Sequence, residues 1–302
     1  MIRINFMKIG FIGLGKMGTR MVIKLQKEGH EIVAWNRSDH ELKNVETIEK
    51  LVKGLDKPRV IWIMISAGEA TQNVLDELSK YIEKGDAIID GGNSYFKDTE
   101  KRYKDFKNKG IKYLGIGVSG GIIAAKEGYP LMVGGDRSAY EFVRPILDSL
   151  SKPNGGHEYF GEGGAGHFVK MVHNGIEYGQ MQAISEGFGV LDKAPYSFDL
   201  VKVAKLYQKG TLVSGFMLDR AIEVLSSDPS LTQIVGSINS SGEAEWTVDQ
   251  AKEEEVPIEI IEKSLEFRKK SQKDPKVQKS FAAKMVAALR KAFGGHEVKK
   301  KL

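Results

Sequence analysis

The fold is decided near the start of the chain, by the stretch Lys8-Ile9-Gly10-Phe11-Ile12-Gly13-Leu14-Gly15-Lys16-Met17-Gly18. Lys8–Gly13 is a short apolar run that indicates a buried strand, and Lys16–Glu28 places its apolar residues at helical spacing. The G-x-G-x-x-G pattern of Gly13–Gly18 joins the two. In that context the first glycine permits a tight turn, the second permits close approach of a pyrophosphate, and the third permits close helix packing. The stretch therefore predicts a dinucleotide-binding turn, with the helix N-terminus facing the pyrophosphate.

Beyond this turn, strand and helix patterns alternate through the first half of the chain. Further strands are expected at 31–35, 59–66, 87–90, 112–116 and 130–134, and further helices at 70–82 and 98–109. The run Arg59–Ser66 is mostly apolar, as strands buried on both faces of a parallel sheet are. This alternation predicts an α/β domain with a Rossmann-type, doubly wound parallel sheet.

The character of the sequence changes at the glycine cluster of residues 161–166. Strand patterns nearly vanish after it. Helical patterns follow at 167–191, 199–210, 212–225, 258–271 and 276–292. We therefore expect a Rossmann-like dinucleotide-binding domain over residues 1–163 and an all-helical domain over residues 164–302.

Composition excludes several classes of protein. The 302 residues include 45 Lys and Arg, 40 Asp and Glu and no Cys, and the formal net charge is +5. Without Cys there is no disulfide framework, no Cys-ligated zinc and no Cys nucleophile. Charges of both signs are interspersed, and only Lys299–Lys301 forms a basic run. This pattern favours attraction of small anions over nucleic-acid binding.

The N-terminus resembles a targeting segment only superficially. It is apolar and carries Arg3 and Lys8, but glycines interrupt the run from Gly10 onward and no small-residue cleavage site follows. No apolar run approaches the roughly 18 residues that a membrane span requires. We expect a cytoplasmic protein with no membrane partner.

The end of the second expected strand bears on the choice of dinucleotide. NAD sites usually carry Asp or Glu at this point to bind the ribose hydroxyls. Here the strand is followed by Asn36-Arg37-Ser38, and a guanidinium can pair with a 2′-phosphate. The residues therefore favour NADP, while the nearby Asp39 leaves NAD open.

One face of the long helix expected at 167–191 carries an unusual set of polar side chains. At about 100° per residue they fall within an arc of roughly 140°. They are Lys170, His173, Asn174, Glu177 and Tyr178. A solvated helix face with a Lys–Glu pair would look similar. The same helix contains four glycines, each of which weakens a helix by about 1 kcal/mol relative to Ala. Close packing or the approach of a ligand is therefore the better interpretation.

Several segments together resemble the decarboxylating 6-phosphogluconate dehydrogenases. The most specific is Gly164-Ala165-Gly166-His167-Phe168-Val169-Lys170-Met171-Val172-His173-Asn174-Gly175-Ile176-Glu177-Tyr178. The others are Gly13–Gly18, Asn36-Arg37-Ser38, Gly91-Gly92-Asn93-Ser94 and Val118-Ser119-Gly120-Gly121. The resemblance covers nearly the whole chain, and the chain length resembles the short branch of the family. The glycine loop alone is shared with all β-hydroxyacid dehydrogenases.

The resemblance implies an activity: oxidative decarboxylation of 6-phosphogluconate to ribulose 5-phosphate and CO2, with hydride transfer to NADP, as in the pentose phosphate pathway and gluconate utilization. Lys170 matches the family's general base and Glu177 its general acid. Contacts to the sugar acid are matched by Asn93, Ser119, Gly120, Gly121, His173 and Asn174, and a phosphate contact by Tyr178. Asn93 is expected beside the cofactor as well. The helical domain would bind substrate and form a homodimer or tetramer.

The C-terminal region extends this resemblance and also departs from it. Arg290-Lys291-Ala292-Phe293-Gly294-Gly295-His296 resembles the family's R-x-x-F-G-x-H, whose Arg and His reach into the partner subunit's site. On the residues alone, the same segment is also typical of a glycine-capped helix end. Arg268 resembles another phosphate-binding arginine.

The departure concerns a phosphate-binding lysine. The long form has it in a K-G-T-G-K-W stretch, which here is Ser241-Gly242-Glu243-Ala244-Glu245-Trp246, without the lysine. Phosphate would then be bound by Tyr178, Arg268 and Arg290.

The residue types suit this chemistry. Oxidation of a hydroxyl β to a carboxylate gives a β-keto acid, which loses CO2 readily when the developing enolate is stabilised, so no metal is required. Lysine acts as a base only when neutral, a form that burial or a charged neighbour such as His173 promotes. Once protonated, Lys170 can hydrogen-bond the keto oxygen. Glu177, two turns along the same face, can protonate the carbon that lost the carboxylate.

Three alternatives stay open at this point. An NAD-preferring 6-phosphogluconate dehydrogenase is the nearest of them. Another β-hydroxyacid dehydrogenase, such as 3-hydroxyisobutyrate dehydrogenase, usually has K-x-x-N-N in this helix and no use for Arg268 and Arg290 as phosphate ligands. A non-catalytic NADP-binding protein would tolerate loss of Lys170 and Glu177.

Overall fold

The computed structural model describes residues 6–240 and 242–299, so Ser241 and two lysines of the basic tail, Lys300 and Lys301, lie outside it. It divides into two units, Met1–Met171 and Val172–Leu302, and the helix α7 (Ala165–Asp192) belongs to both. The boundary expected after Gly163 falls just before α7, whereas the units divide inside that helix. The first turns of α7 pack tightly on the sheet, since a Cβ added at Gly166 would lie 2.4 Å from the carbonyl oxygens of Gly115 and Met132.

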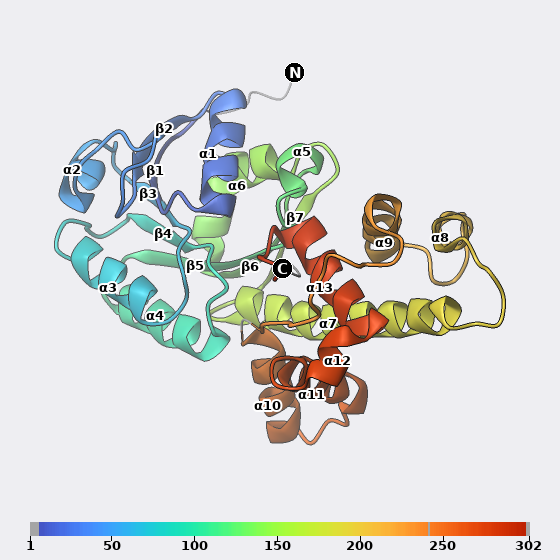
Figure 1. Cartoon of the computed structure of the whole chain (residues 1–302). Coiled ribbons are helices and arrows are strands. Elements are labelled where there is room, and N and C mark those ends of the chain that lie inside the picture. The colour runs from blue at the N-terminus through green and yellow to red at the C-terminus, as the bar shows by residue number, and fades with distance from the viewer. Residues whose placement is uncertain (1–5, 241, 300–302) are drawn as a thin grey trace. The chain divides into compact units, whose positions relative to one another are not determined.

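The first unit is built on one seven-stranded sheet (Figure 1). Its strand order is β2-β1-β3-β4-β5-β6-β7, and all neighbours are parallel except β5 and β6. The strands are β1 (Lys8–Ile12), β2 (Glu31–Trp35), β3 (Val60–Ile63), β4 (Ala87–Asp90), β5 (Lys112–Val118), β6 (Pro130–Gly135) and β7 (Gly156–Gly161). The expected Rossmann-type, doubly wound sheet is confirmed.

Two features of the sheet differ from the expectation of a wholly parallel sheet. β6 runs antiparallel to β5, because the connection between them holds only the four-residue helix α5 (Ala124–Glu127). A parallel crossover needs a dozen or more residues, usually a full helix. The strand β7 was not expected, because its six residues lead directly into the glycine cluster and only half of them are partly buried.

Helices cover both faces of this sheet (Figure 1). On one face, side chains from α1 (Lys16–Lys27), α5 and α6 (Arg137–Ser151) join the core with alternate strand residues. On the other face, the core includes α2 (Ile48–Lys53), α3 (Glu69–Leu78) and α4 (Phe96–Asn108). Both faces are therefore buried, and the carboxyl ends of β1 to β5 lie at one edge of the sheet, where such folds bind ligands.

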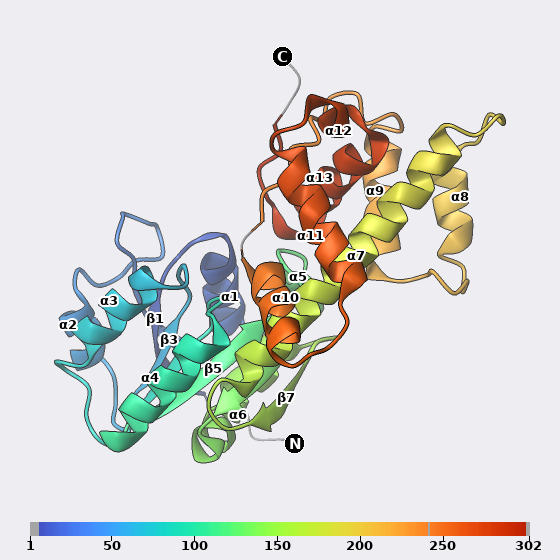
Figure 2. The same ribbon diagram turned by 90° about the horizontal axis from the view of Figure 1, so that it is seen from below.

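The second unit is all-helical over its described residues, as expected (Figure 2). Besides the later turns of α7, it contains α8 (Leu200–Tyr207), α9 (Phe216–Ser227), α10 (Glu243–Glu253), α11 (Glu259–Ser271), α12 (Pro275–Lys279) and α13 (Phe281–Gly294). One hydrophobic core joins side chains from α7, α8, α9, α10, α11 and α13. Within the described ranges, no helix is long and apolar enough to cross a membrane.

Candidate active site

The glycine turn has the geometry that a dinucleotide requires. Gly13 adopts a φ of +101°, in the region that favours glycine. A Cβ at Gly18 would lie 2.0 Å from the Gly13 carbonyl oxygen, whereas a Cβ at Gly15 would meet nothing within 4 Å. No side chain caps the start of α1 at Gly15. The N–H groups at this helix end and the open backbone around Gly15 therefore fit a pyrophosphate.

The loop that follows β2 is tied to this turn. The Asn36 side chain accepts a hydrogen bond from the Leu14 N–H at 3.0 Å and donates to the Ser38 carbonyl and hydroxyl, each at 3.1 Å. Arg37 is exposed between these two residues. Asp39 is fully exposed and lies 3.9 Å from the Lys43 ammonium. Arg37 is thus exposed near the glycine turn, where it could contact a bound dinucleotide. Asp39 has Lys43 as a basic neighbour.

The loops after β4 and β5 carry the expected sugar-acid contacts of the first unit. Asn93 is exposed, while Gly92 and Ser94 on either side of it are buried. Gly120 and Gly121 both have left-handed backbone, with φ of +89° and +56°. The Ser119 N–H donates to the Pro130 carbonyl at 2.9 Å, which fixes the start of that loop.

Lys170 is buried on the sheet side of α7, with 7% of its surface exposed. A Cβ added at Gly117 of β5 would lie 2.3 Å from the Lys170 Cβ, so the glycine makes room for the lysine stem. Further along α7, the Asn174 side-chain oxygen lies 3.0 Å from His173 Nδ1. The structure therefore places each of these residues on α7 as expected, with the lysine shielded from water.

In the second unit, two arginines are buried near Tyr178. The Arg268 guanidinium stacks over the Tyr178 ring, 3.1 Å from its centroid, and its Nη2 lies 4.0 Å from the Met181 sulfur. Arg268 is 2% exposed and Arg290 is 7% exposed. In the described part of the chain, neither guanidinium has a carboxylate oxygen within salt-bridge distance, and the buried Tyr178 hydroxyl has no hydrogen-bond partner.

The electrostatics of this cluster favour an anion. Burial lowers the pKa of Arg268 to about 10, while Tyr178 and Glu177 act to raise it and Arg290 acts to lower it further. Burial also lowers the pKa of Arg290, against the smaller effects of Tyr178, Glu177 and Glu243. Both arginines are still charged at neutral pH, so the cluster holds two desolvated cations. A bound dianion such as a phosphate would offset that cost.

The acids that replace the family's lysine stretch lie in two different environments. Glu245 forms a salt bridge with Lys269 at 2.5 Å, and both side chains are about half exposed. Glu243 is buried, with 4% of its surface exposed, and it acts on the Arg290 charge. Without the family's lysine, Arg268, Arg290 and Tyr178 remain as the expected phosphate ligands.

The expected reach of Arg290 into a partner subunit stays a prediction from the sequence resemblance. Within its own chain, Arg290 lies near enough to Tyr178 and Glu177 for both of them to raise its pKa against the larger effect of burial. Arg290 is buried because it lies on α13, whose residues from Ala283 to Arg290 nearly all lie in the core of the helical unit. The helix ends with Gly295 in left-handed conformation as a glycine cap, and the exposed His296 packs edge-on against Phe293.

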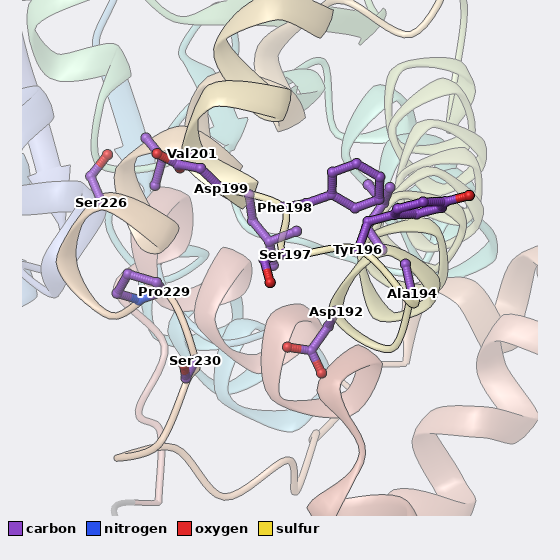
Figure 3. Close-up of a pocket in the computed structure, with 12 residues that line it drawn as sticks. Asp192, Ala194, Tyr196, Ser197, Phe198, Asp199, Val201, Ser226, Pro229 and Ser230 are labelled. Carbon is purple, nitrogen blue, oxygen red and sulfur yellow. The ribbon is translucent and has the colours of Figure 1, made fainter.

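A cavity of about 780 Å³ lies elsewhere in the helical unit, between the α7–α8 loop and the end of α9 (Figure 3). Tyr196, Phe198, Asp192 and Asp199 contribute to its lining, and the lining residues include no Lys, Arg or His. None of the expected site residues lines it. It does not suit an anionic substrate. Among the described residues, no group of three or more His, Asp or Glu side chains could hold a metal ion.

Together, the Rossmann-type sheet, its glycine turn and the following helical unit define an NAD(P)-binding oxidoreductase of two domains. Comparison with protein families gives the particular family. Residues 8–163 match the NAD binding domain of 6-phosphogluconate dehydrogenase, and residues 166–300 match the C-terminal domain of 6-phosphogluconate dehydrogenase. The chain belongs to the 6-phosphogluconate dehydrogenase family, as the sequence resemblance implied.

Individual relatives agree on the family and differ on the cofactor. YqeC of Bacillus subtilis, provisionally named a 6-phosphogluconate dehydrogenase, is 40% identical over 98% of this chain and 100% of its own length. An NAD(+)-dependent, decarboxylating 6-phosphogluconate dehydrogenase of Haloferax volcanii is 36% identical over 98% of this chain and 99% of its own. The solved Plasmodium falciparum 6-phosphogluconate dehydrogenase, described with NADP+ and with 6-phosphogluconate, has a TM-score of 0.79 and 33% identity, covering 88% of this chain and 62% of that one.

Proposed function

We propose that this protein oxidatively decarboxylates 6-phosphogluconate to ribulose 5-phosphate and CO2, with NADP as the preferred hydride acceptor. The observation that carries the proposal is the pair of buried arginines, Arg268 and Arg290, beside the unpartnered hydroxyl of Tyr178. Tyr178 lies on the same helix as the buried Lys170. A phosphate bound by the arginines would satisfy the tyrosine hydroxyl and neutralise both cations.

On this proposal, the roles of this chain's residues are those that the family resemblance implies. A bound nicotinamide would supply the hydride acceptor. Lys170 takes the proton of the substrate hydroxyl as the hydride departs, and its ammonium form then donates a hydrogen bond to the new keto oxygen. When CO2 leaves, its bonding electron pair stays on the substrate as an enolate, which this ammonium stabilises. Glu177 protonates the carbon that carried the carboxylate, while Asn93, Ser119, Gly120, Gly121, His173 and Asn174 orient the sugar acid.

A second candidate function is oxidation of an unphosphorylated 3-hydroxy acid such as 3-hydroxyisobutyrate. Initial rates with 6-phosphogluconate, gluconate and 3-hydroxyisobutyrate at equal concentration separate the two. We expect turnover of 6-phosphogluconate alone, because the two unphosphorylated acids leave Arg268 and Arg290 unpaired. Faster turnover of 3-hydroxyisobutyrate would replace the proposed function by the second candidate.

The preference for NADP rests on Arg37. Its replacement by glutamate should lower the ratio of kcat/KM with NADP to kcat/KM with NAD by about 100-fold. The substitution removes a charge-assisted hydrogen bond worth about 1.5–3 kcal/mol and adds repulsion against the 2′-phosphate. Steady-state rates with both cofactors measure the ratio. Lys101→Glu makes the same change of charge on the exposed side of α4 and should leave the ratio unchanged. An unchanged ratio in Arg37→Glu would remove this arginine from the cofactor site.

We also propose that the protein forms a homodimer or tetramer. Seven of the thirteen exposed large apolar side chains of the described residues fall within residues 190–216: Val190, Tyr196, Phe198, Leu206, Leu212, Val213 and Phe216. Such a concentration of exposed apolar side chains supports association through this part of the helical unit. The contribution of His296 to a partner's site and the cytoplasmic location stay predictions from the sequence.

In contrast to the arrangement that the resemblance implies, we propose that each chain uses its own Arg290, because this side chain is buried and is influenced by Tyr178 and Glu177 of the same chain. Lys170→Met and Arg290→Met subunits should therefore fail to complement one another when they are mixed under conditions of subunit exchange. Every mixed dimer would lack either the lysine or the arginine in each site. Activity of the mixture is the measurement. If Arg290 acted across the interface, one site of each mixed dimer would be intact, and activity would recover to about a quarter of the wild-type value.

A further inference from the structure

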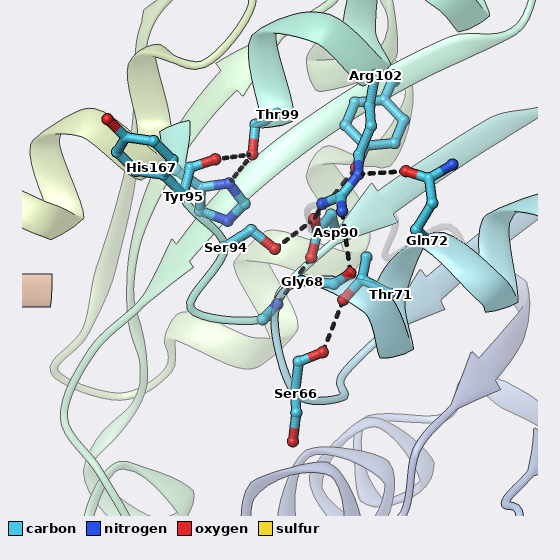
Figure 4. Close-up of polar contacts among 12 residues, drawn as sticks. Ser66, Gly68, Thr71, Gln72, Asp90, Ser94, Tyr95, Thr99, Arg102 and His167 are labelled. Atoms are coloured by element: carbon cyan, nitrogen blue, oxygen red, sulfur yellow. Dashed lines mark hydrogen bonds and ion pairs between the residues drawn. The ribbon is translucent and has the colours of Figure 1, made fainter. Parts of the chain in front are cut away.

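A buried carboxylate lies directly beneath the loop that carries Asn93. Asp90 ends β4 and is fully buried. Its Oδ1 accepts a hydrogen bond from the Gly92 N–H at 3.1 Å, and its Oδ2 accepts from the Ser94 hydroxyl at 2.7 Å. The two residues that flank the exposed Asn93 are thus both bonded to the same carboxylate, and Figure 4 shows the bond from Ser94.

Two further side chains fix this carboxylate from outside the loop. The Tyr113 hydroxyl of β5 donates to Oδ2 at 3.1 Å, and Arg102 Nη1 of α4 lies 3.5 Å from the same oxygen. Both side chains are buried, with Tyr113 0% and Arg102 5% exposed. Burial, together with the Asp90 charge, holds the pKa of Tyr113 well above its ordinary value, so the tyrosine stays a hydrogen-bond donor.

Arg102 also connects the Asn93 loop to the loop after β3 and to α3 (Figure 4). Its Nη2 donates to the Gly68 carbonyl at 3.2 Å and its Nε donates to the Gln72 side chain at 3.2 Å. On the other side, Thr99 of α4 lies 2.7 Å from Nδ1 of His167, three residues before Lys170 on α7. Two groups of buried polar contacts therefore lie near the Asn93 loop: one centres on Asp90 and Arg102, and the other joins Thr99 to His167 at the base of the lysine-bearing helix.

The backbone of the Asn93 loop is closely packed against its neighbours. A Cβ added at Gly91 would lie 2.4 Å from Trp62 Nε1, and one added at Gly92 would lie 2.7 Å from the Ile65 carbonyl oxygen. The loop therefore packs directly against β3 and the residues that follow it. The hydrogen bonds of Asp90 then select one conformation within that tight space. A buried ion pair such as Arg102–Asp90 adds little net stability, so its main effect is the geometry that it enforces.

We propose that Asp90 is a positioning residue for the reaction, which through Gly92 and Ser94 fixes the loop that presents Asn93 to substrate and cofactor. Arg102 and Tyr113 act with it by fixing the carboxylate itself. This inference rests on the proposed function, because Asn93 is expected to contact the substrate and nicotinamide of that reaction. Asp90 touches neither reactant; its effect passes through Asn93.

The test is a double-mutant cycle between Tyr113→Phe and Asn93→Ala, read as kcat/KM for 6-phosphogluconate. Phenylalanine keeps the ring that stacks on Phe106 with centroids 5.5 Å apart, and it removes only the hydroxyl bonded to Asp90. Tyr113→Phe should lower kcat/KM about tenfold in the wild-type background and by less than about twofold in the Asn93→Ala background. Its effect on melting temperature should be the same in both backgrounds. Ser94→Ala, which removes a second donor, should behave likewise.

Tyr129→Phe is the matched control, since Tyr129 is also fully buried in the first unit but its hydroxyl has no partner among the described residues. It should leave kcat/KM unchanged. The positioning role is overturned if Tyr113→Phe has no kinetic effect, or if it lowers kcat/KM equally in both backgrounds, as a general loss of structure would. An inactive wild-type protein would instead contradict the proposed function.

Discussion

Replacing Lys170 by methionine should lower kcat with 6-phosphogluconate by at least about 10³-fold, the upper part of the range that a positioned general base contributes. Methionine fills the space of the lysine stem against Gly117, so the fold should be retained. The dissociation constant for NADP should change by less than about threefold, because the glycine turn and Arg37 do not contact this side chain in the proposed scheme. Steady-state kinetics and cofactor titration give the two values.

Lys170→Arg separates two explanations for such a loss. Arginine keeps the positive charge at this position but cannot act as a base, because it is not deprotonated in proteins. We expect it to be as inactive as methionine. Substantial turnover by Lys170→Arg would mean that the lysine stabilises charge without taking the proton. Loss of NADP binding in both variants would point to a disrupted fold.

Replacing Arg268 by methionine should raise KM for 6-phosphogluconate about 100-fold and should not lower the melting temperature. The first effect reflects lost charge-assisted hydrogen bonds to phosphate, each worth about 1.5–3 kcal/mol. The second follows from desolvation. A pKa lowered from 12.5 to about 10 corresponds to about 3 kcal/mol of unfavourable free energy for the charged form in the fold. Because the folded pKa lies below the unfolded one, this penalty is present at every pH below about 10.

Arg220→Met is the control for Arg268. Arg220 also stacks on an aromatic ring of the helical unit, 5.1 Å from the Phe216 centroid, but it is not among the expected phosphate ligands. It should leave KM unchanged. If Arg268→Met lost stability while KM stayed the same, the arginine would be a structural residue and the phosphate site would have to lie elsewhere.

Much of the fold could be predicted from local sequence. The glycine turn, the apolar strands and the helical periodicity of the second half each depend on residues close together in the chain. The helices α2, α6 and α10 and the half-buried strand β7 were not predicted: α2 and β7 are short, and Pro145 interrupts the pattern of α6. The reversal of β6 depends on the length of a connection. These features are set by how elements pack, which no single segment records.

The same distinction applies to the site. The polar side chains on one face of α7 could be recognised from the sequence because a single helix carries them. The structure buries two of them, Lys170 and Tyr178. The stacking of Arg268 on Tyr178 joins positions ninety residues apart, and only the family resemblance pointed to it. Asp90 was visible in the sequence only as the end of a strand. Its partners Arg102 and Tyr113 come from other elements, so their convergence on the Asn93 loop required the fold.

We propose that one site both oxidises and decarboxylates a phosphorylated sugar acid. The most direct measurement mixes the purified protein with 6-phosphogluconate and either NADP or NAD, and follows reduced nicotinamide and released CO2 together. We expect equal amounts of the two products, formed faster with NADP. Reduced cofactor without CO2 would mean a simple dehydrogenase, and no reaction with either cofactor would contradict the proposed substrate.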